Sequence, residues 1–245
     1  MPLPLRDRRR PVPYPNAAIS LVAASSQNGN ITDALQSGLD PGTSDWSIEA
    51  WVHSTSLAAL RTICAKGATS NIAGAAEGYW FFVNTTGTLG AQMSDTANTT
   101  RIGYTSAATI SVNTWAHVVA NFDRDLNLTA YINGTATTAT AISTRAGTVD
   151  CNAPFAIGSS SNSAGAFGSY WQGYIDALRF RNRLMTVAEI SRSYNNGIGL
   201  AYRDLSGEER AGVVSAWELD YSLRDAHGQN HLAPANSPTY FVGKR

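Results

Sequence analysis

The chain has little charge, few cysteines and no long apolar run. Charged residues make up 15% of its 245 residues, and Lys+Arg and Asp+Glu both total 18, so the net charge is zero. A chain without excess positive charge is not expected to bind nucleic acid, because a nucleic-acid-binding surface must neutralise the charge of the phosphates. No apolar stretch approaches the roughly 20 residues of a membrane-spanning helix, so membrane insertion is not expected either.

Two cysteines are present, Cys64 and Cys151. A disulfide between them is compatible with the sequence, since spacing alone cannot show whether two cysteines meet. Two separate thiols, packed as small apolar side chains, are the simpler interpretation.

Residues 1–15 are expected to form an extended arm. They hold five prolines and four arginines, and proline neither pairs in a sheet interior nor continues a helix. The arm is either a loose tail or a polyproline-like segment that docks on a neighbouring subunit, with anchors at Arg6, Arg8, Arg9 and Arg10. The arginines are not followed by the apolar segment of a secretory signal, so a signal peptide is not expected.

Residues 16–222 are expected to form one domain built from β-strands. Short apolar and β-branched runs, such as 46–52 and 115–122, alternate with turn residues, and no helical period separates them. Asn133-Gly134 is a strong hairpin signal. Strands this frequent are typical of an all-β sandwich or barrel.

The pattern changes after residue 183. Residues 186–189 (T-V-A-E) and 206–209 (S-G-E-E) have the form of a capping box, which predicts one or two short C-terminal helices. The last segment, 223–245, is polar and contains proline, so a tail is expected there.

Several motifs occur along the chain in a fixed order. They are W-S-I-E-A-W-V at 46–52, N-T-W-A-H-V-V-A at 113–120, L-T-A-Y-I-N-G at 128–134 and W-Q-G-Y-I-D-A-L-R-F at 171–180. Together they resemble the strand signatures of the concanavalin A-like, laminin-G-like jelly-roll family. The resemblance implies a two-sheet antiparallel jelly-roll sandwich of the lectin/glucanase type. It does not fix the function, because this fold hosts lectins, adhesion modules, glycosidases and virion proteins.

One motif is displaced relative to the family. Residues 212–220 (G-V-V-S-A-W-E-L-D) resemble a strand that family members often carry before the domain, whereas here it follows the domain. Such a strand either completes the sandwich from the other end or begins a second sandwich supplied by another chain.

The sequence does not predict an enzyme. Jelly-roll glycosidases need two carboxylates that flank the scissile bond, and alternate acidic residues on one strand would supply them. Glu49 has no acidic neighbour two residues away, and the pair Glu218 and Asp220 lies at the end of its predicted strand. The histidines have neither triad nor metal-binding context.

Calcium is the one cofactor that the resemblance brings into consideration. Relatives hold Ca²⁺ at the sandwich rim with Asp side chains and backbone carbonyls, which suit a hard cation. Asp176 matches the family's structurally important Asp. In the other interpretation, which we favour, the Asp176 carboxylate accepts hydrogen bonds from backbone N–H groups at a turn.

A sugar site would need aromatic faces together with amide or hydroxyl groups. The loop 159–171 supplies Trp171, Tyr170 and Asn162, and Tyr79 and Tyr104 are further candidates on predicted strands. The alternative is that large rings such as Trp171 belong to the core.

The leading functional hypothesis is a non-enzymatic structural or adhesion protein of a tailed bacteriophage. As a minor tail or capsid decoration protein, it would lie on the exterior of the particle. Its partners would be other virion subunits, copies of itself and a cell-surface glycan. The alternatives are a free carbohydrate-binding lectin and, less favoured, a glycoside hydrolase.

Overall fold

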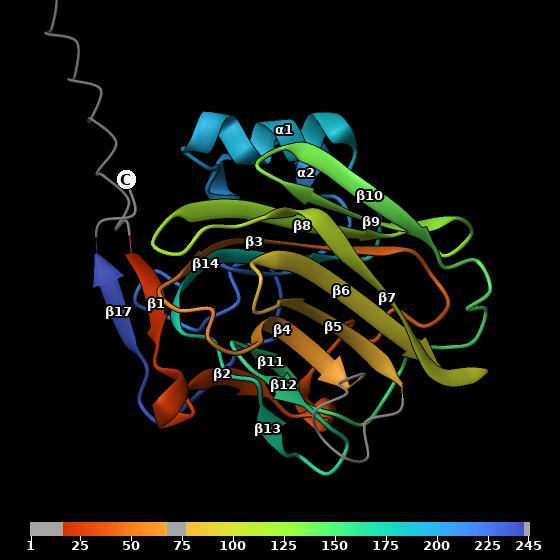
Figure 1. Ribbon diagram of the computed structural model, residues 1–245, viewed down its shortest axis with the longest axis horizontal. Helices are drawn as coiled ribbons and strands as arrows, with labels where there is room; N and C mark the ends of the chain where they lie inside the picture. The colour runs from red at the N-terminus through yellow and green to blue at the C-terminus, as the bar shows by residue number, and fades with distance from the viewer. Residues whose placement is uncertain (1–16, 68–76, 243–245) are drawn as a thin grey trace, which may run out of the picture.

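The computed structural model describes residues 17–67 and 77–242, and these form two antiparallel β-sheets stacked face to face (Figure 1). The prediction of an all-β, two-sheet sandwich is confirmed. The proline-rich arm, with Arg6, Arg8, Arg9 and Arg10, lies outside the described residues.

The first sheet contains eight of the described strands. Seven follow the order β10-β9-β8-β3-β14-β1-β17, and β15 pairs with β14. Their bounds are Ala17–Leu21 (β1), Trp46–Ser54 (β3), Trp115–Phe122 (β8), Asn127–Ile132 (β9), Thr135–Ala141 (β10), Gly173–Arg181 (β14), Val213–Trp217 (β15) and Thr239–Val242 (β17).

The second sheet has the order β16-β2-β11-β4-β5-β6-β7 within the described residues. Its strands are Asn28–Ile31 (β2), Arg61–Gly67 (β4), Gly78–Val83 (β5), Thr88–Asp95 (β6), Asn98–Thr109 (β7), Phe155–Ile157 (β11) and Ala233–Ala235 (β16). Ser160–Ser161 (β12) and Phe167–Gly168 (β13) form a separate small hairpin. Short 3₁₀ turns lie at Ala23–Ser25, Asp33–Leu35, Asn195–Gly197 and Tyr202–Asp204.

The predicted hairpin at Asn133-Gly134 is confirmed. These two residues join β9 to β10, and their φ angles are 51° and 80°. Positive φ at both central residues is the geometry of a type I′ turn, whose twist matches the twist of the flanking strands.

Alternation along each strand decides which side chains enter the core. On β3, Trp46, Ile48, Ala50 and Val52 are completely buried between the sheets. Trp46 stacks on Phe122 of the neighbouring strand β8, with ring centroids 4.2 Å apart. Because successive side chains point to opposite faces, the intervening β3 residues lie on the outer face of the first sheet.

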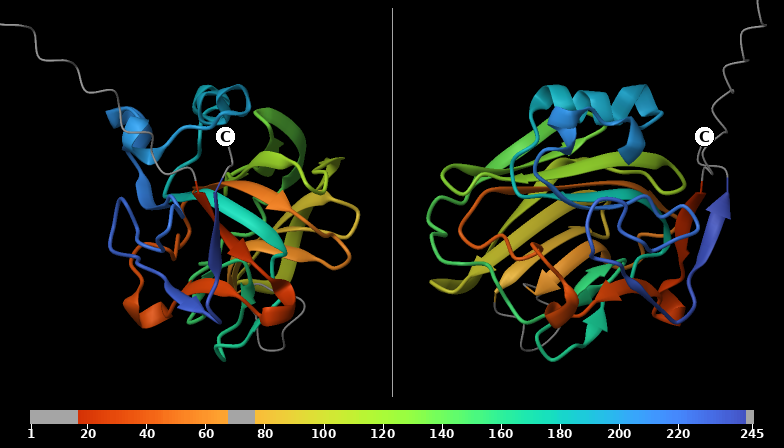
Figure 2. Two further views of the ribbon diagram at one scale, coloured as in Figure 1. Left: turned by 90° about the vertical axis from the view of Figure 1, so that its left-hand side faces the viewer. Right: turned by 180° about the vertical axis from the view of Figure 1, so that it is seen from behind.

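Two short helices cover part of that outer face. They are α1, Val187–Tyr194, and α2, Gly207–Arg210, and both lie on the same side of the sandwich (Figures 1 and 2). Thr186 and Ser206 form the two predicted capping boxes, with Glu189 and Glu209 respectively. Strands β1 and β17 lie at the end of the sheet beyond the helices (Figure 1). Within the described residues, no helix is long and apolar enough to cross a membrane.

The end of the chain belongs to both sheets. β15 pairs with the second half of β14, so the displaced 212–220 motif completes the sandwich of its own chain. Within residues 223–245, the expected polar tail, two short segments are strands, because Ala233–Ala235 (β16) pairs with β2 and Thr239–Val242 (β17) pairs with β1. Both strands lie at sheet edges, where polar residues and proline are tolerated, so the sequence pattern of this segment does not show them.

Candidate functional site

A group of buried charges lies on the outer face of the first sheet. Glu49, on β3, is 1% exposed. Its Oε1 accepts from Arg179 Nη1 at 3.1 Å and lies 2.7 Å from Arg181 Nη2, while Oε2 is 3.2 Å from His117 Nε2. Arg179 also bridges to Glu218, whose Oε1 is 3.1 Å from Nη2.

These carboxylates are arranged for structure and not for acid–base catalysis. Burial alone would raise the pKa of Glu49, but the charges of Arg181 and Arg179 and the His117 contact outweigh burial and hold that pKa well below its usual range. Glu218 Oε2 accepts from the Tyr202 backbone N–H at 3.0 Å. A glycosidase acid needs a carboxyl group that keeps its proton near neutral pH, and Glu49 is the opposite case.

The predicted sugar residues Trp171 and Tyr79 are part of the core. Both are 0% exposed, and the Tyr79 hydroxyl donates to the carbonyl of Leu39 at 2.9 Å. Neither ring has a free face for a ligand, so these two candidates are wrong. Both rings belong to the core cluster between the sheets, as the alternative interpretation held for Trp171.

The remaining candidates of that prediction are scattered. Tyr170 is partly exposed, and its carbonyl accepts from Arg61 Nη1 at 3.0 Å. Asn162 is 2% exposed, and its Oδ1 accepts from the Ala166 backbone N–H at 2.8 Å, which closes a turn. Tyr104 lies on β7 opposite Ala91, and its side chain is outside what the structure describes. The structure therefore does not assemble the predicted residues into one site.

Asp176, the predicted calcium ligand, is 6% exposed and lies opposite Trp51 of β3. Among residues 17–67 and 77–242, no three His, Cys, Asp or Glu side chains are grouped to hold a metal ion. Calcium at Asp176, with ligands drawn mainly from backbone carbonyls, stays a prediction.

The two cysteines are separate thiols, as the simpler interpretation held. Cys151 lies beside Lys66, whose Nζ contacts Asp33 at 2.8 Å and Asp40 at 2.7 Å and donates to the Cys151 carbonyl. Burial raises the pKa of the Cys151 thiol, although the Lys66 charge opposes that shift. A thiol with a raised pKa is a poor nucleophile at neutral pH, so the role of this cluster is structural. Through Lys66, it attaches the segments that carry Asp33, Asp40 and Cys151 to β4.

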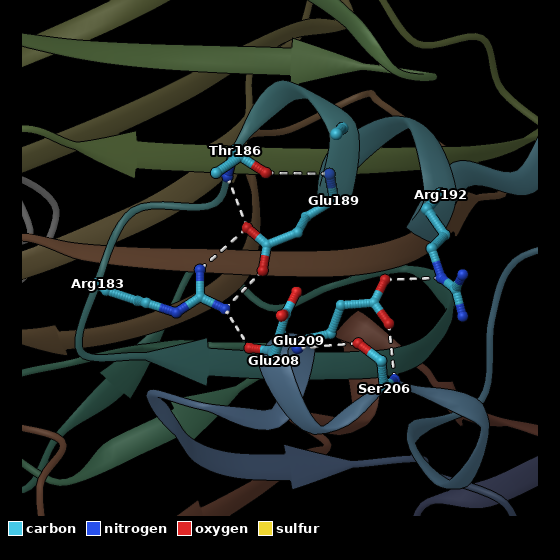
Figure 3. Close-up of a pocket in the computed structure, with 8 residues that line it drawn as sticks. Arg183, Thr186, Glu189, Arg192, Ser206, Glu208 and Glu209 are labelled. Atoms are coloured by element: carbon cyan, nitrogen blue, oxygen red, sulfur yellow. Dashed lines mark hydrogen bonds and ion pairs between the residues drawn. The ribbon is translucent and has the colours of Figure 1, made fainter.

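The helices border a groove of about 480 Å³ (Figure 3). Arg183 pairs with Glu189 at 2.5 Å and donates to the Glu208 carbonyl at 3.1 Å, and Arg192 pairs with Glu209 at 2.7 Å. Glu189 and Glu209 also serve the capping boxes. The polar groups of the groove therefore satisfy one another and hold the two helices together.

Four partly exposed rings form a row across the part of the same sheet face that helices α1 and α2 do not cover. The row consists of Trp115 on β8, His53 on β3, Tyr174 on β14 and Phe241 on β17. Ring centroids are 5.4 Å apart for His53 and Trp115, 5.2 Å for His53 and Tyr174, and 4.2 Å for Tyr174 and Phe241. We call these four residues the aromatic row.

Strand register explains why the aromatic row forms. His53 lies directly opposite Trp115 on one side and Tyr174 on the other. Gly173 allows the close approach of β14 to β3, because its φ is 127° and an added Cβ would lie 2.1 Å from the His53 carbonyl oxygen. Aromatic cross-strand pairs also stabilise the sheet.

The helix stops just short of the aromatic row. Trp51, two residues before His53 on the same face, stacks on Tyr194, the last residue of α1, with centroids 6.0 Å apart. The turn after the helix then closes over Trp51 at Gly199, where an added Cβ would lie 2.9 Å from the Trp51 Nε1. Trp51 is therefore buried, whereas the next ring along the strand is left partly exposed.

Residues 25–191 match the family model described as the concanavalin A-like lectin/glucanases superfamily. The chain belongs to this superfamily. The matched segment excludes β1, β15, β16 and β17, so the superfamily core is extended here by strands from both ends of the chain. No curated protein matches the chain.

Solved structures share the superfamily fold. A candidate carbohydrate-binding protein from Bacteroides ovatus ATCC 8483 has a TM-score of 0.67 at 14% identity, with 93% of this chain and 60% of that chain covered. A heptameric SAP-like pentraxin from Limulus polyphemus has a TM-score of 0.64 at 14% identity, with 94% and 97% covered. The binding domain of Paraclostridial Mosquitocidal Protein 1 has a TM-score of 0.53 at 16% identity, with 73% and 46% covered. At these identities the likeness shows the fold alone, and the chain spans 60% of the first protein's length.

Proposed function

We propose that the protein is a non-catalytic, glycan-binding adhesion module. The observation that carries this proposal is the aromatic row, in which partly exposed rings gather on a sheet face that the helices leave open. Aromatic rings present apolar faces that suit the C–H side of a sugar ring. The buried carboxylates of the same sheet are neutralised by arginine, which supports binding and not hydrolysis.

The test is binding of the purified chain to a glycan array, together with a hydrolysis assay on a polysaccharide panel. The proposal predicts retention of at least one class of glycan and no release of reducing sugar. An array without any bound glycan would contradict it, and so would turnover that is lost in Glu218→Gln.

We further propose that this module acts on the exterior of a tailed bacteriophage particle, as a minor tail or capsid decoration protein. The support comes from the sequence, in which a proline- and arginine-rich segment precedes a lectin-like sandwich. That segment would dock on another virion subunit. Particles that incorporate the protein normally after deletion of residues 1–15 would contradict this docking role, whereas loss of incorporation with an unchanged fold is the expected result.

A further inference from the structure

The spacing of the aromatic row indicates a ligand with a short repeat. The step from Trp115 to His53 is 5.4 Å, and the step from His53 to Tyr174 is 5.2 Å. These steps are nearly equal because the three residues are direct cross-strand partners on adjacent strands. One pyranose unit of an extended polysaccharide has a similar length, so successive sugars can each contact one ring.

The orientation of the rings indicates that the ligand is a single polysaccharide chain and not the flat surface of a crystalline polysaccharide. The interplanar angle is 58° between His53 and Trp115, 44° between His53 and Tyr174, and 19° between Tyr174 and Phe241. The twist between adjacent strands turns Trp115, His53 and Tyr174 relative to one another, whereas Phe241 lies beyond β1 and stacks nearly parallel to Tyr174. A crystalline polysaccharide would need coplanar rings, whereas a single chain can rotate at each glycosidic bond and follow the twist.

The side chains of the aromatic row and its border suit uncharged sugars. Trp115 and Phe241 have no ionisable group, and Tyr174 adds a hydroxyl that can donate and accept hydrogen bonds. At the border, Thr55 and Gln172 are partly exposed, Gln172 Nε2 lies 3.4 Å from Thr55 Oγ1, and Gln172 Oε1 accepts from the Ala23 backbone N–H at 3.0 Å. Their hydroxyl and amide groups both donate and accept hydrogen bonds, which is what sugar hydroxyls require.

We infer that the aromatic row binds a single extended chain of uncharged pyranose sugars, with successive sugars along Trp115, His53 and the stacked pair of Tyr174 and Phe241. The inference rests on the proposed glycan-binding function and adds the place, the length and the charge of the ligand. Because each added sugar extends the contact along the row, the affinity rises with chain length until the row is filled.

The experiment is calorimetric titration with soluble β-1,4-linked glucose and N-acetylglucosamine oligosaccharides, from the monosaccharide to the hexasaccharide. We expect the dissociation constant to fall with length and then level off. Trp115→Ala and Tyr174→Ala should each weaken binding of the longest bound oligosaccharide roughly tenfold, the ratio that about one stacking contact supplies. Tyr174→Phe keeps the ring and should bind as wild type.

Two controls separate this inference from the proposed function. Tyr170→Ala, in the loop 159–171, and Leu126→Ala, at an exposed turn, should leave binding unchanged. Thermal unfolding of every variant checks that it is folded. If glycan binding is lost in Tyr170→Ala but kept in Trp115→Ala, the aromatic row is not the binding site, whereas the proposed glycan-binding function still holds.

Other outcomes also contradict the inference. Binding of a monosaccharide as tight as that of the hexasaccharide, or binding of microcrystalline polysaccharide without any soluble oligosaccharide, would overturn the single-chain ligand. If Trp115→Ala instead dissociates an oligomer in analytical ultracentrifugation and leaves sugar binding unchanged, the occupant of the row is a second copy of the chain. The absence of any sugar binding by the wild type would overturn both proposals.

Discussion

Glu49 is the buried carboxylate that pairs with two arginines, Arg179 and Arg181, on the outer face of the first sheet. It lies between Arg179 and Arg181 under the helices, at 1% exposure. A buried ion pair is only a weak source of net stability, because both charges lose their hydration. Removing one partner is costly, however, since the other charge is then left buried and unpaired.

The substitution Glu49→Gln is expected to destabilise the fold by about 3–5 kcal/mol, the usual cost of breaking a buried pair. Urea unfolding followed by tryptophan fluorescence measures this change. Glu208→Gln is the matched control, because Glu208 is exposed and its loss should leave the free energy of unfolding nearly unchanged. A Glu49→Gln protein as stable as the control would contradict the structural role of the cluster.

The stabilisation from Glu49 also depends on pH in a defined direction. The arginine charges hold the folded-state pKa of Glu49 well below its usual range, so the unfolded chain binds the proton more readily. The stabilisation is complete above about pH 5 and is lost as the pH falls through the folded-state pKa. Unfolding free energies at descending pH should therefore show the wild-type advantage over Glu49→Gln shrinking, and an advantage that stays constant down to pH 3 would contradict this.

At this scale the sequence predicted little of the site. It excluded a catalytic carboxylate pair, but it could not show that Glu49 is neutralised by arginines 130 and 132 positions away. Trp171 and Tyr79 were chosen for the chemistry of their rings, and they are buried because they lie between the sheets. Side-chain type alone does not distinguish a core ring from a surface ring.

Helix α1 shows how a short element depends on its cap. It has only eight residues, and an isolated helix of that length is marginal in water. The Thr186 side chain accepts from the Glu189 backbone N–H, and the Glu189 carboxylate accepts from the Thr186 backbone N–H. Ile190 then packs against Met185, Val119 and Tyr131 beneath it.

Loss of this cap should lower the thermal stability measurably. Thr186→Ala is expected to cost about 1 kcal/mol, which corresponds to roughly 2–4 °C in Tm for a domain of this size. Differential scanning calorimetry is the measurement. Ser191→Ala, at an exposed position inside α1, should shift Tm by less, and an equal shift in both variants would argue against the capping box.

The elements were more predictable than the site. The capping boxes, the Asn133-Gly134 hairpin and the main strands follow from local rules that the sequence displays. The aromatic row needs register as well, because it unites residues from four strands far apart in the chain. Alternation from Trp51 to His53 places the His53 ring on the outer face, but only the fold shows that the helix leaves this ring open.

The C-terminal strands complete both sheets of the sandwich. β15 and β17 extend the first sheet and β16 extends the second, so the last described strand, β17, lies beside the first, β1. Tyr240 packs against the core, and Phe241 completes the aromatic row. The C-terminal segment is therefore part of both the fold and the proposed site.

Deletion of residues 233–245 is expected to destabilise the domain by at least about 2 kcal/mol, the value of one large apolar side chain removed from its packing. Deletion of residues 243–245 alone, beyond β17, is the control and should have little effect. Thermal unfolding of the two truncated proteins checks this. Equal stability would instead support the independent tail that the sequence predicted.

The central claim is that a sugar chain binds across the strands of the first sheet, beside the helices. Its most direct test is an NMR titration of the labelled protein with the longest oligosaccharide that binds. The account predicts that amide and ring shifts concentrate at Trp115, His53, Tyr174 and Phe241. Shifts concentrated in the rim loop 159–171, with the aromatic row unchanged, would contradict it.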